Sequence, residues 1–221
     1  VTVNDLTGTD VTRVNVDLAG TIGGTIGDGQ IDTVISNGTS GDDEIRAFRG
    51  DDTATFLQGQ LTNDLRSLHA DTAQWNGYCS PKGRLLGNFL MWRQGEDYCL
   101  QLSGDILAGV LKRLSMFILR AKVQARNASD ENVRLVVAGR QALAAVTAAM
   151  GAVPEATMRS VAGEAGQVIR LGDDKFVLSI APGRAAAVWQ ALRQSATPVG
   201  APVWDWLRLN AGIPMIVAAT Q

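Results

Sequence analysis

From residue 44 onward, hydrophobic and polar positions follow the periods of strands and helices in turn. Alternating or short apolar runs bounded by turn residues predict β-strands, and apolar residues three and four apart predict helices. The expected strands cover residues 44–48, 74–80, 84–93, 97–102, 122–127, 133–138, 158–161, 167–171 and 175–180, and the expected helices cover 51–64, 105–119, 140–150 and 184–193. Strands grouped in hairpins between helices predict an α+β fold with mainly antiparallel sheets.

The helix over residues 105–119 has the clearest pattern. Behind a Ser103-Gly104-Asp105 start, its apolar positions fall at helical spacing: Ile106, Leu107, Val110, Leu111, Leu114 and Ile118. Lys112 and Arg113 lie on its outer face, which we expect to be a solvated surface rather than a nucleic-acid patch.

Residues 1–43 differ in composition from the rest and predict an acidic tail or fusion segment. Residues 1–45 contain eight acids and one base, whereas residues 46–221 contain 14 acids and 19 bases. Alternation over 14–18 predicts one strand there. The segment resembles Asp/Gly-rich flanks of calcium-binding β-roll proteins, and Gly41-Asp42-Asp43 and Gly50-Asp51-Asp52 recur nine residues apart. Two copies are too few for a roll, and Gly50-Asp51-Asp52 is equally explained as a helix start with an aspartate N-cap.

Composition favours a globular protein without a membrane span. The chain is 46% hydrophobic and 19% charged, and no apolar run approaches the ~18 residues that cross a bilayer. We see no signal peptide and expect a cytoplasmic location with no membrane partner. Cys79 and Cys99 fit no zinc or redox spacing, so we expect small buried residues on neighbouring strands. A single histidine, His69, argues against a histidine-based metal site or triad, and we assign no metal ligands.

One stretch, residues 56–93, carries a family resemblance. It reads FLQGQLTNDLRSLHADTAQWNGYCSPKGRLLGNFLMWR, a short helix followed by a hairpin whose turn is Ser80-Pro81-Lys82-Gly83. This order resembles the opening of the YgfZ/GcvT-like folate-binding family, over about residues 44–221. The resemblance implies two interleaved subdomains, one of them ferredoxin-like, and a tetrahydrofolate or one-carbon derivative as cofactor.

The resemblance also implies where a folate would bind. A pterin needs a flat apolar slot with a few amide or carboxylate partners, and its acidic tail needs bases. We therefore expect contacts from the first helix end, from two aromatic walls, and from further polar and basic positions: Gln58, Gln60, Asn63, Asp64, Trp75, Tyr78, Lys82, Arg84, Asn88, Arg120 and Asn210. Gln60, Tyr78 and Asn88 are expected to converge on one hollow. Helix closure by Asn63-Asp64 and sheet packing by Trp75 and Tyr78 are the alternatives.

Departures from the transferase pattern favour the YgfZ branch. In the glycine-cleavage aminomethyltransferases, paired aspartates follow the glycine-containing turn, and the equivalent positions here are Gly87 and Asn88. An amide has no ionisable proton and cannot serve as the acid. Asn210 similarly replaces a pterin-binding glutamate. We therefore assign no catalytic residue.

The function implied by the resemblance is folate binding in iron–sulfur cluster assembly or repair and in the tRNA modification that depends on it. Iron–sulfur enzymes are possible partners, without direct nucleic-acid contact. The family's cysteine signature and barrel lie past Gln221, so we expect a truncated chain with a partial pocket. Alternatives are an aminomethyltransferase, a secreted calcium-binding module, and an acidic segment joined artificially to a truncated gene.

Overall fold

The computed structural model describes residues 33–37 and 44–221, and its described part forms two compact units. The first unit holds residues 33–37, 133–157 and 161–212, and the second holds 44–132, 158–160 and 213–221. The chain therefore passes between the units several times. No helix in the described part is long and apolar enough to cross a membrane.

The first unit contains a six-stranded sheet, ordered β11-β1-β7-β10-β9-β8. Its strands are β1 (Thr33–Asn37), β7 (Val133–Gly139), β8 (Arg159–Gly163), β9 (Gly166–Gly172), β10 (Lys175–Ile180) and β11 (Thr197–Val199). Its helices are α3 (Ala142–Met150), α4 (Pro182–Leu192) and α5 (Ala201–Asn210). Apart from the edge strand β8, the succession β7-α3-β9-β10-α4-β11 is the βαββαβ order of a ferredoxin-like subdomain, into which β1 inserts between β11 and β7. This arrangement confirms the predicted fold class.

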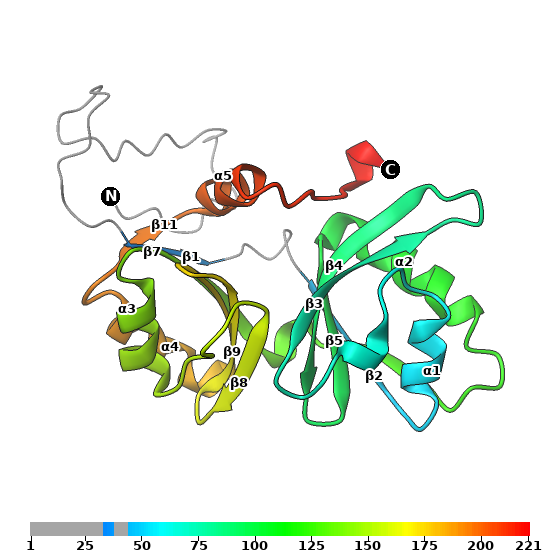
Figure 1. The fold of residues 1–221 in the computed structure, drawn as a ribbon, viewed down its shortest axis with the longest axis horizontal. Helices are drawn as coiled ribbons and strands as arrows, with labels where there is room; N and C mark the ends of the chain where they lie inside the picture. Colours follow the sequence, from blue (N-terminus) through cyan, green and yellow to red (C-terminus); the bar gives the residue numbers. More distant parts are fainter. Residues whose placement is uncertain (1–32, 38–43) are drawn as a thin grey trace. The chain divides into compact units, whose positions relative to one another are not determined.

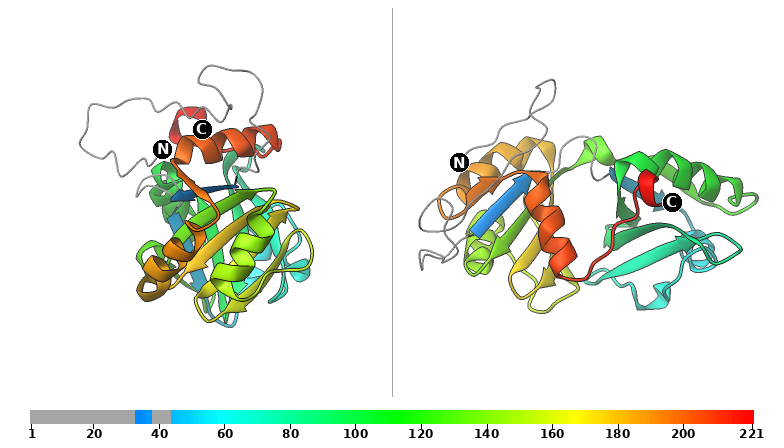
Figure 2. Two further views of the ribbon diagram at one scale, coloured as in Figure 1. Left: turned by 90° about the vertical axis from the view of Figure 1, so that its left-hand side faces the viewer. Right: turned by 90° about the horizontal axis from the view of Figure 1, so that it is seen from above.

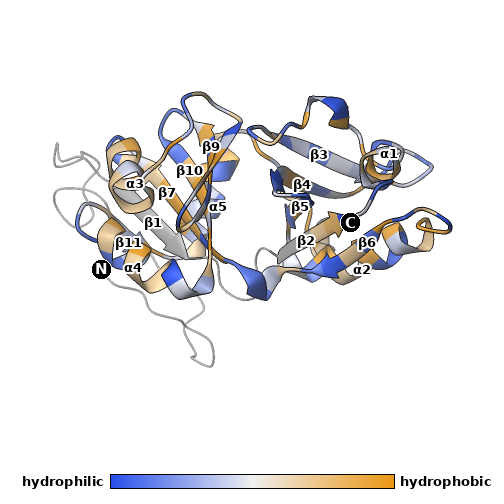
Figure 3. Ribbon diagram, turned by 90° about the horizontal axis from the view of Figure 1, so that it is seen from below, coloured by the Kyte–Doolittle hydropathy of each residue, from blue (hydrophilic) through white to orange (hydrophobic). Residues whose placement is uncertain are grey.

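Helices α3 and α4 cover one face of this sheet (Figure 1). Alternate residues of β7 and β10, including Leu135, Val137 and Phe176, pack there against Val146 and Leu192. Figure 3 colours β7 and β10 mostly as hydrophobic, as expected for strands buried on both faces.

Helix α5 packs on the other face of the sheet. Val203 and Leu207 contact Ala138 and Val199, and Figure 2 shows α5 beside β1. Ala138 adjoins Val137 in β7, so the two side chains point to opposite faces.

The second unit contains a five-stranded antiparallel sheet, ordered β3-β4-β5-β2-β6. Its strands are β2 (Glu44–Arg49), β3 (Ala73–Cys79), β4 (Leu85–Gln94), β5 (Asp97–Leu102) and β6 (Gln124–Asn127). Its helices are α1 (Thr53–Gln58) and α2 (Gly104–Met116), with short 3-10 turns η1 (Leu65–Ser67), η2 (Ser129–Glu131) and η3 (Ala218–Thr220). Phe48, Phe89 and Leu100 from the strands pack with Leu57 of α1 and Leu114 of α2 in its core.

The first predicted helix is shorter than expected. Instead of running over 51–64, α1 ends at Gln58, and the next residues form a loop along the edge of β3. Asp52 does occupy the N-cap position, but its side chain makes no cap bond. Its Oδ2 accepts a hydrogen bond from the backbone N–H of Lys122 at 2.7 Å, which joins the start of α1 to the segment before β6.

The cysteines do not lie on neighbouring strands, which corrects the sequence interpretation. Cys79 is half-buried on β3 and Cys99 is buried on β5, and β4 separates the two strands. Both thiols are free, and burial raises the pKa of the Cys99 thiol to about 12. The thiolate is the reactive form of cysteine, and a thiol with a raised pKa stays protonated at neutral pH. Cys99 is therefore a core residue rather than a reactive one.

A buried carboxylate connects β2, β5 and β6. Asp97 accepts hydrogen bonds from Arg49 Nε at 2.6 Å and from Arg126 Nη2 at 2.7 Å, and its side chain is 8% exposed. Arg126 also pairs with Glu131 at 2.9 Å. Burial alone would raise the pKa of Asp97, but the hydrogen bonds from Arg126 and Arg49 outweigh it and hold that pKa below its usual range.

Replacing this carboxylate by an amide should destabilise the second unit in a pH-dependent way. We expect Asp97→Asn to cost about 1–3 kcal/mol at pH 7, because it removes the charge that pairs two arginines. A depressed pKa contributes stability above the unfolded value of about 3.9 and loses it as the pH falls through the folded value. The difference between wild type and variant in urea unfolding should therefore shrink below about pH 4. The exposed Asp130→Asn is the control, and a difference independent of pH would contradict the assignment.

Candidate functional site

The loop that follows α1 is tied to the edge strand β3 by side-chain amides. The backbone N–H of Asn63 donates to Asn76 Oδ1 at 3.0 Å, and Asn63 Nδ2 donates to the Trp75 carbonyl at 2.5 Å. Gln58 Oε1 accepts from the backbone N–H of Leu65 at 2.7 Å. The side chains of Gln58 and Asn63 therefore hold this loop in place.

Asp64 closes the same loop. Its side chain accepts from the backbone N–H of Arg66 at 3.0 Å and pairs with the Arg66 guanidinium at 2.8 Å. Hydrogen bonds from Arg66 hold the pKa of Asp64 below its usual range, so it is ionised at neutral pH. Asp64 caps the start of η1, so it does not close the first helix, which ends at Gln58.

The two aromatic residues predicted to flank a pterin, Trp75 and Tyr78, lie on opposite faces of the β3–β4 hairpin. Trp75 lies opposite Leu90, Gly77 opposite Asn88, and Tyr78 opposite Gly87. Opposed residues share a face and successive residues alternate. Trp75 and Asn88 therefore lie on one face, and Tyr78 on the other.

Tyr78 is a core residue. It is 4% exposed and belongs to the hydrophobic cluster beneath α2. The structure does not bring it together with Asn88, which corrects the expectation that Gln60, Tyr78 and Asn88 converge. For Tyr78, the packing alternative describes what is observed.

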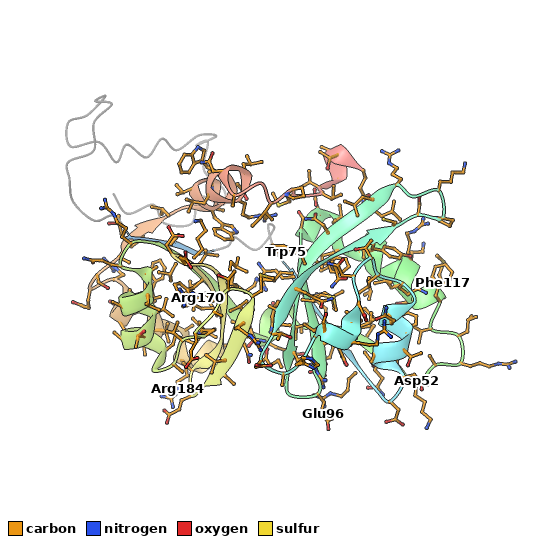
Figure 4. All side chains as sticks on the ribbon, in the orientation of Figure 1. Asp52, Trp75, Glu96, Phe117, Arg170 and Arg184 are labelled. Atoms are coloured by element: carbon orange, nitrogen blue, oxygen red, sulfur yellow. The ribbon has the colours of Figure 1, made fainter. Side chains whose placement is uncertain are left out.

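The face that carries Trp75 and Asn88 has a glycine at its centre. A Cβ on Gly77 would lie 2.8 Å from Leu85 Cδ1 and 3.2 Å from Thr62 Oγ1, so a side chain has no room there. Trp75 is half-buried on β3 (Figure 4). An aromatic ring and an amide thus share one face, and the side chains of Leu85 and Thr62 fill the space over the glycine between them.

The side chain of Asn88 uses both of its groups to hold a backbone segment. Asn88 Nδ2 donates to the Pro214 carbonyl at 2.6 Å, and Asn88 Oδ1 accepts from the Ile216 N–H at 2.8 Å. Further along, Asp105 Oδ2 accepts from the Ala218 N–H at 2.8 Å, and Gln221 Nε2 donates to the Leu86 carbonyl. We call residues 213–221 the strap, because they lie along β4 and the start of α2.

The other predicted residues have no polar side-chain contact in the described part of the chain. Gln60 is half-buried, while Lys82, Arg84, Arg120 and Asn210 are exposed. Lys82 lies in the β3–β4 turn, Arg120 follows α2, and Asn210 ends α5 in the first unit. No group of three or more His, Cys, Asp or Glu in the described residues is arranged to hold a metal ion. The calcium motif at 41–43 lies outside those residues, and Gly50-Asp51-Asp52 leads into α1.

Known proteins resemble the chain in fold and in sequence. The crystal structure of the glycine cleavage system aminomethyltransferase T from Bartonella henselae matches 83% of this chain with a TM-score of 0.72 at 20% identity, over 52% of its own length. The fold is therefore that of the aminomethyltransferase T proteins. No protein-family model matches.

Sequence relatives come mainly from one branch. The tRNA-modifying protein YgfZ of Serratia proteamaculans is 28% identical over 176 residues, and that of Vibrio vulnificus 29% over 172 residues. The aminomethyltransferase of Thermus thermophilus is 29% identical over 179 residues. The matches cover 76–79% of this chain but only 51–53% of the relatives, so the chain spans about half of their length. They confirm the predicted resemblance to the YgfZ/GcvT-like family.

Removing the Asn88 amide should release the strap. We expect Asn88→Ala to speed hydrogen exchange at the Ile216 amide about fivefold to thirtyfold, because a lost hydrogen bond costs about 1–2 kcal/mol locally. Asn88→Asp should release it too, because a carboxylate cannot donate to the Pro214 carbonyl and would repel it. Asn132→Ala serves as a matched amide control, and unchanged exchange in both Asn88 variants would refute the clamp.

Proposed function

We propose that residues 44–221 form the folate-binding part of a YgfZ-like protein that acts in iron–sulfur cluster assembly or repair and in the associated tRNA modification. The observation that carries the proposal is the similarity to tRNA-modifying YgfZ proteins over nearly four fifths of the chain. The amide at position 88 supports it, because it stands where the resemblance expects a transferase acid. The role of the whole protein is inferred from relatives that are about twice as long.

Within the second unit, the β3–β4 face is the proposed pterin platform. The Trp75 ring supplies the proposed stacking surface, and the side chains of Leu85 and Thr62 lie over Gly77 beside it. Asn88 holds the strap with one hydrogen of its NH₂ group and one lone pair of its oxygen. An amide has two donors and two lone pairs, so Asn88 keeps one of each for the edge of a pterin ring.

The remaining predicted contacts belong to the same proposal. Gln60 would add a further amide. Gln58, Asn63 and Asp64 would shape the neighbouring loop. The exposed bases Lys82 and Arg120 would meet the acidic tail of folate. Asn210, which ends α5 of the first unit, stays a prediction. The proposed ligand is tetrahydrofolate or a one-carbon derivative.

Titration with 5-formyl-tetrahydrofolate tests the platform. We expect saturable binding in calorimetry and an affinity about tenfold weaker in Trp75→Leu, because stacking on an aromatic ring is worth about 1–3 kcal/mol. Trp189→Leu is the matched control, since Trp189 is half-buried like Trp75 and lies on α4. Absence of binding at millimolar ligand would remove the folate proposal for this chain.

Aminomethyl transfer is the second candidate, favoured by the fold match and by the Thermus thermophilus relative. Asn88 counts against it, because an amide cannot exchange a proton with the folate nitrogen at neutral pH. We expect no methylene-tetrahydrofolate from the lipoyl-bound intermediate in a coupled assay. Measurable product would overturn the preference for the YgfZ-like role.

A further inference from the structure

The end of α2 leaves three large apolar side chains in water. Met116 is 56% exposed, Phe117 50% and Leu119 87%, whereas Leu114 just before them is 1% exposed. Ile118, between them, packs against the core and anchors the segment. Figure 4 labels Phe117 at the outer end of the helix.

Uncompensated positive charge surrounds these side chains. Lys112 lies one turn before Met116, and Arg113 one turn before Phe117, so each base is a surface neighbour of an apolar residue. Arg120 follows directly, and no acid occurs from residue 106 to residue 129. In the described part of the chain, Lys112, Arg113 and Arg120 have no ion pair. We call residues 112, 113, 116, 117 and 119 the α2-end patch.

Single exposed apolar residues are ordinary, but a contiguous group framed by charge indicates an interaction surface. Methionine, aromatic residues and arginine are the types enriched at protein interfaces. We propose that the α2-end patch is a docking surface for a protein that presents apolar side chains surrounded by Asp and Glu. This inference does not rest on folate binding.

A protein fits this surface better than a nucleic acid does. Surfaces for single-stranded nucleic acid combine bases with several aromatic platforms, and here only Phe117 has a ring. Met116 and Leu119 instead match the apolar centre of a protein interface, with the cations at its rim. Uncompensated positive charge selects an acidic partner, and rim charges act mainly through the association rate and its salt dependence.

The probe is a synthetic amphipathic helical peptide of Leu and Glu, followed by fluorescence anisotropy. We expect saturable binding that weakens with added salt. The double variant Phe117→Ser/Leu119→Ser should weaken it about tenfold or more, and Lys112→Glu/Arg113→Glu should do the same. Leu143→Ser on α3 and Arg193→Glu at the end of α4 are matched controls that should stay within about twofold of wild type. Leu143 is 45% exposed, and Arg193 is also exposed.

Several outcomes would overturn the proposal. These are no peptide binding at millimolar concentration, an equal loss of peptide affinity in the control variants, or a peptide affinity that is unchanged in both patch variants. Binding of poly(U) or bulk tRNA that requires Lys112 and Arg113 but not Phe117 would instead make the patch a nucleic-acid surface. Failure here is separable from failure of the folate proposal, because titration of Lys112→Glu/Arg113→Glu with 5-formyl-tetrahydrofolate should match wild type.

Discussion

Two hydrogen bonds of the Asn88 side chain fix the strap to β4 in the second unit's sheet. The strap needs a donor toward the Pro214 carbonyl and an acceptor toward the Ile216 N–H, and a neutral amide supplies both at any pH. A carboxylate would supply only acceptors. One side chain therefore cannot serve both as the acid of a transferase and as the clamp of this strap. The neutral amide of Asn88 explains both why it holds the strap and why it cannot act as an acid.

The candidate platform depends on this clamp and on the alternation of β3. Because Trp75 and Gly77 are two residues apart, they share a face with Asn88 on the next strand. The loop after α1 is closed by Gln58 and supports the edge strand through Asn63, so the platform is held at its edge as well as along β4. Side chains that support the loop are thus distinct from those that can face a ligand.

Much of the fold could be predicted from the sequence, because its strands and helices have strong periods. The strands at 97–102 and 175–180 have the predicted bounds. The short strand β11 was missed because three residues give too little alternation. Strand β1 was missed because it lies in the segment interpreted as an acidic tail and pairs with partners distant in the chain. The first helix was predicted too long because the polar residues after Gln58 resemble a helix surface, while in the fold they bond to β3.

The candidate site was predictable in residue type but only partly in geometry. Trp75 and Tyr78 are an odd number of residues apart, so strand alternation alone predicts that they lie on opposite faces. The partners of Asn88 could not, because they lie more than 120 positions away in the chain. The family resemblance identified the position, and only the fold shows what its amide holds.

The most direct measurement is nuclear magnetic resonance of the Asn88 side-chain amide in the wild-type protein. We expect one of its two Nδ2 hydrogens, the one donated to the Pro214 carbonyl, to exchange with water far more slowly than that of a free amide. We also expect a coupling across the hydrogen bond between the Ile216 amide nitrogen and the Asn88 Cγ. Two rapidly exchanging Nδ2 hydrogens, with an unprotected Ile216 amide, would contradict it.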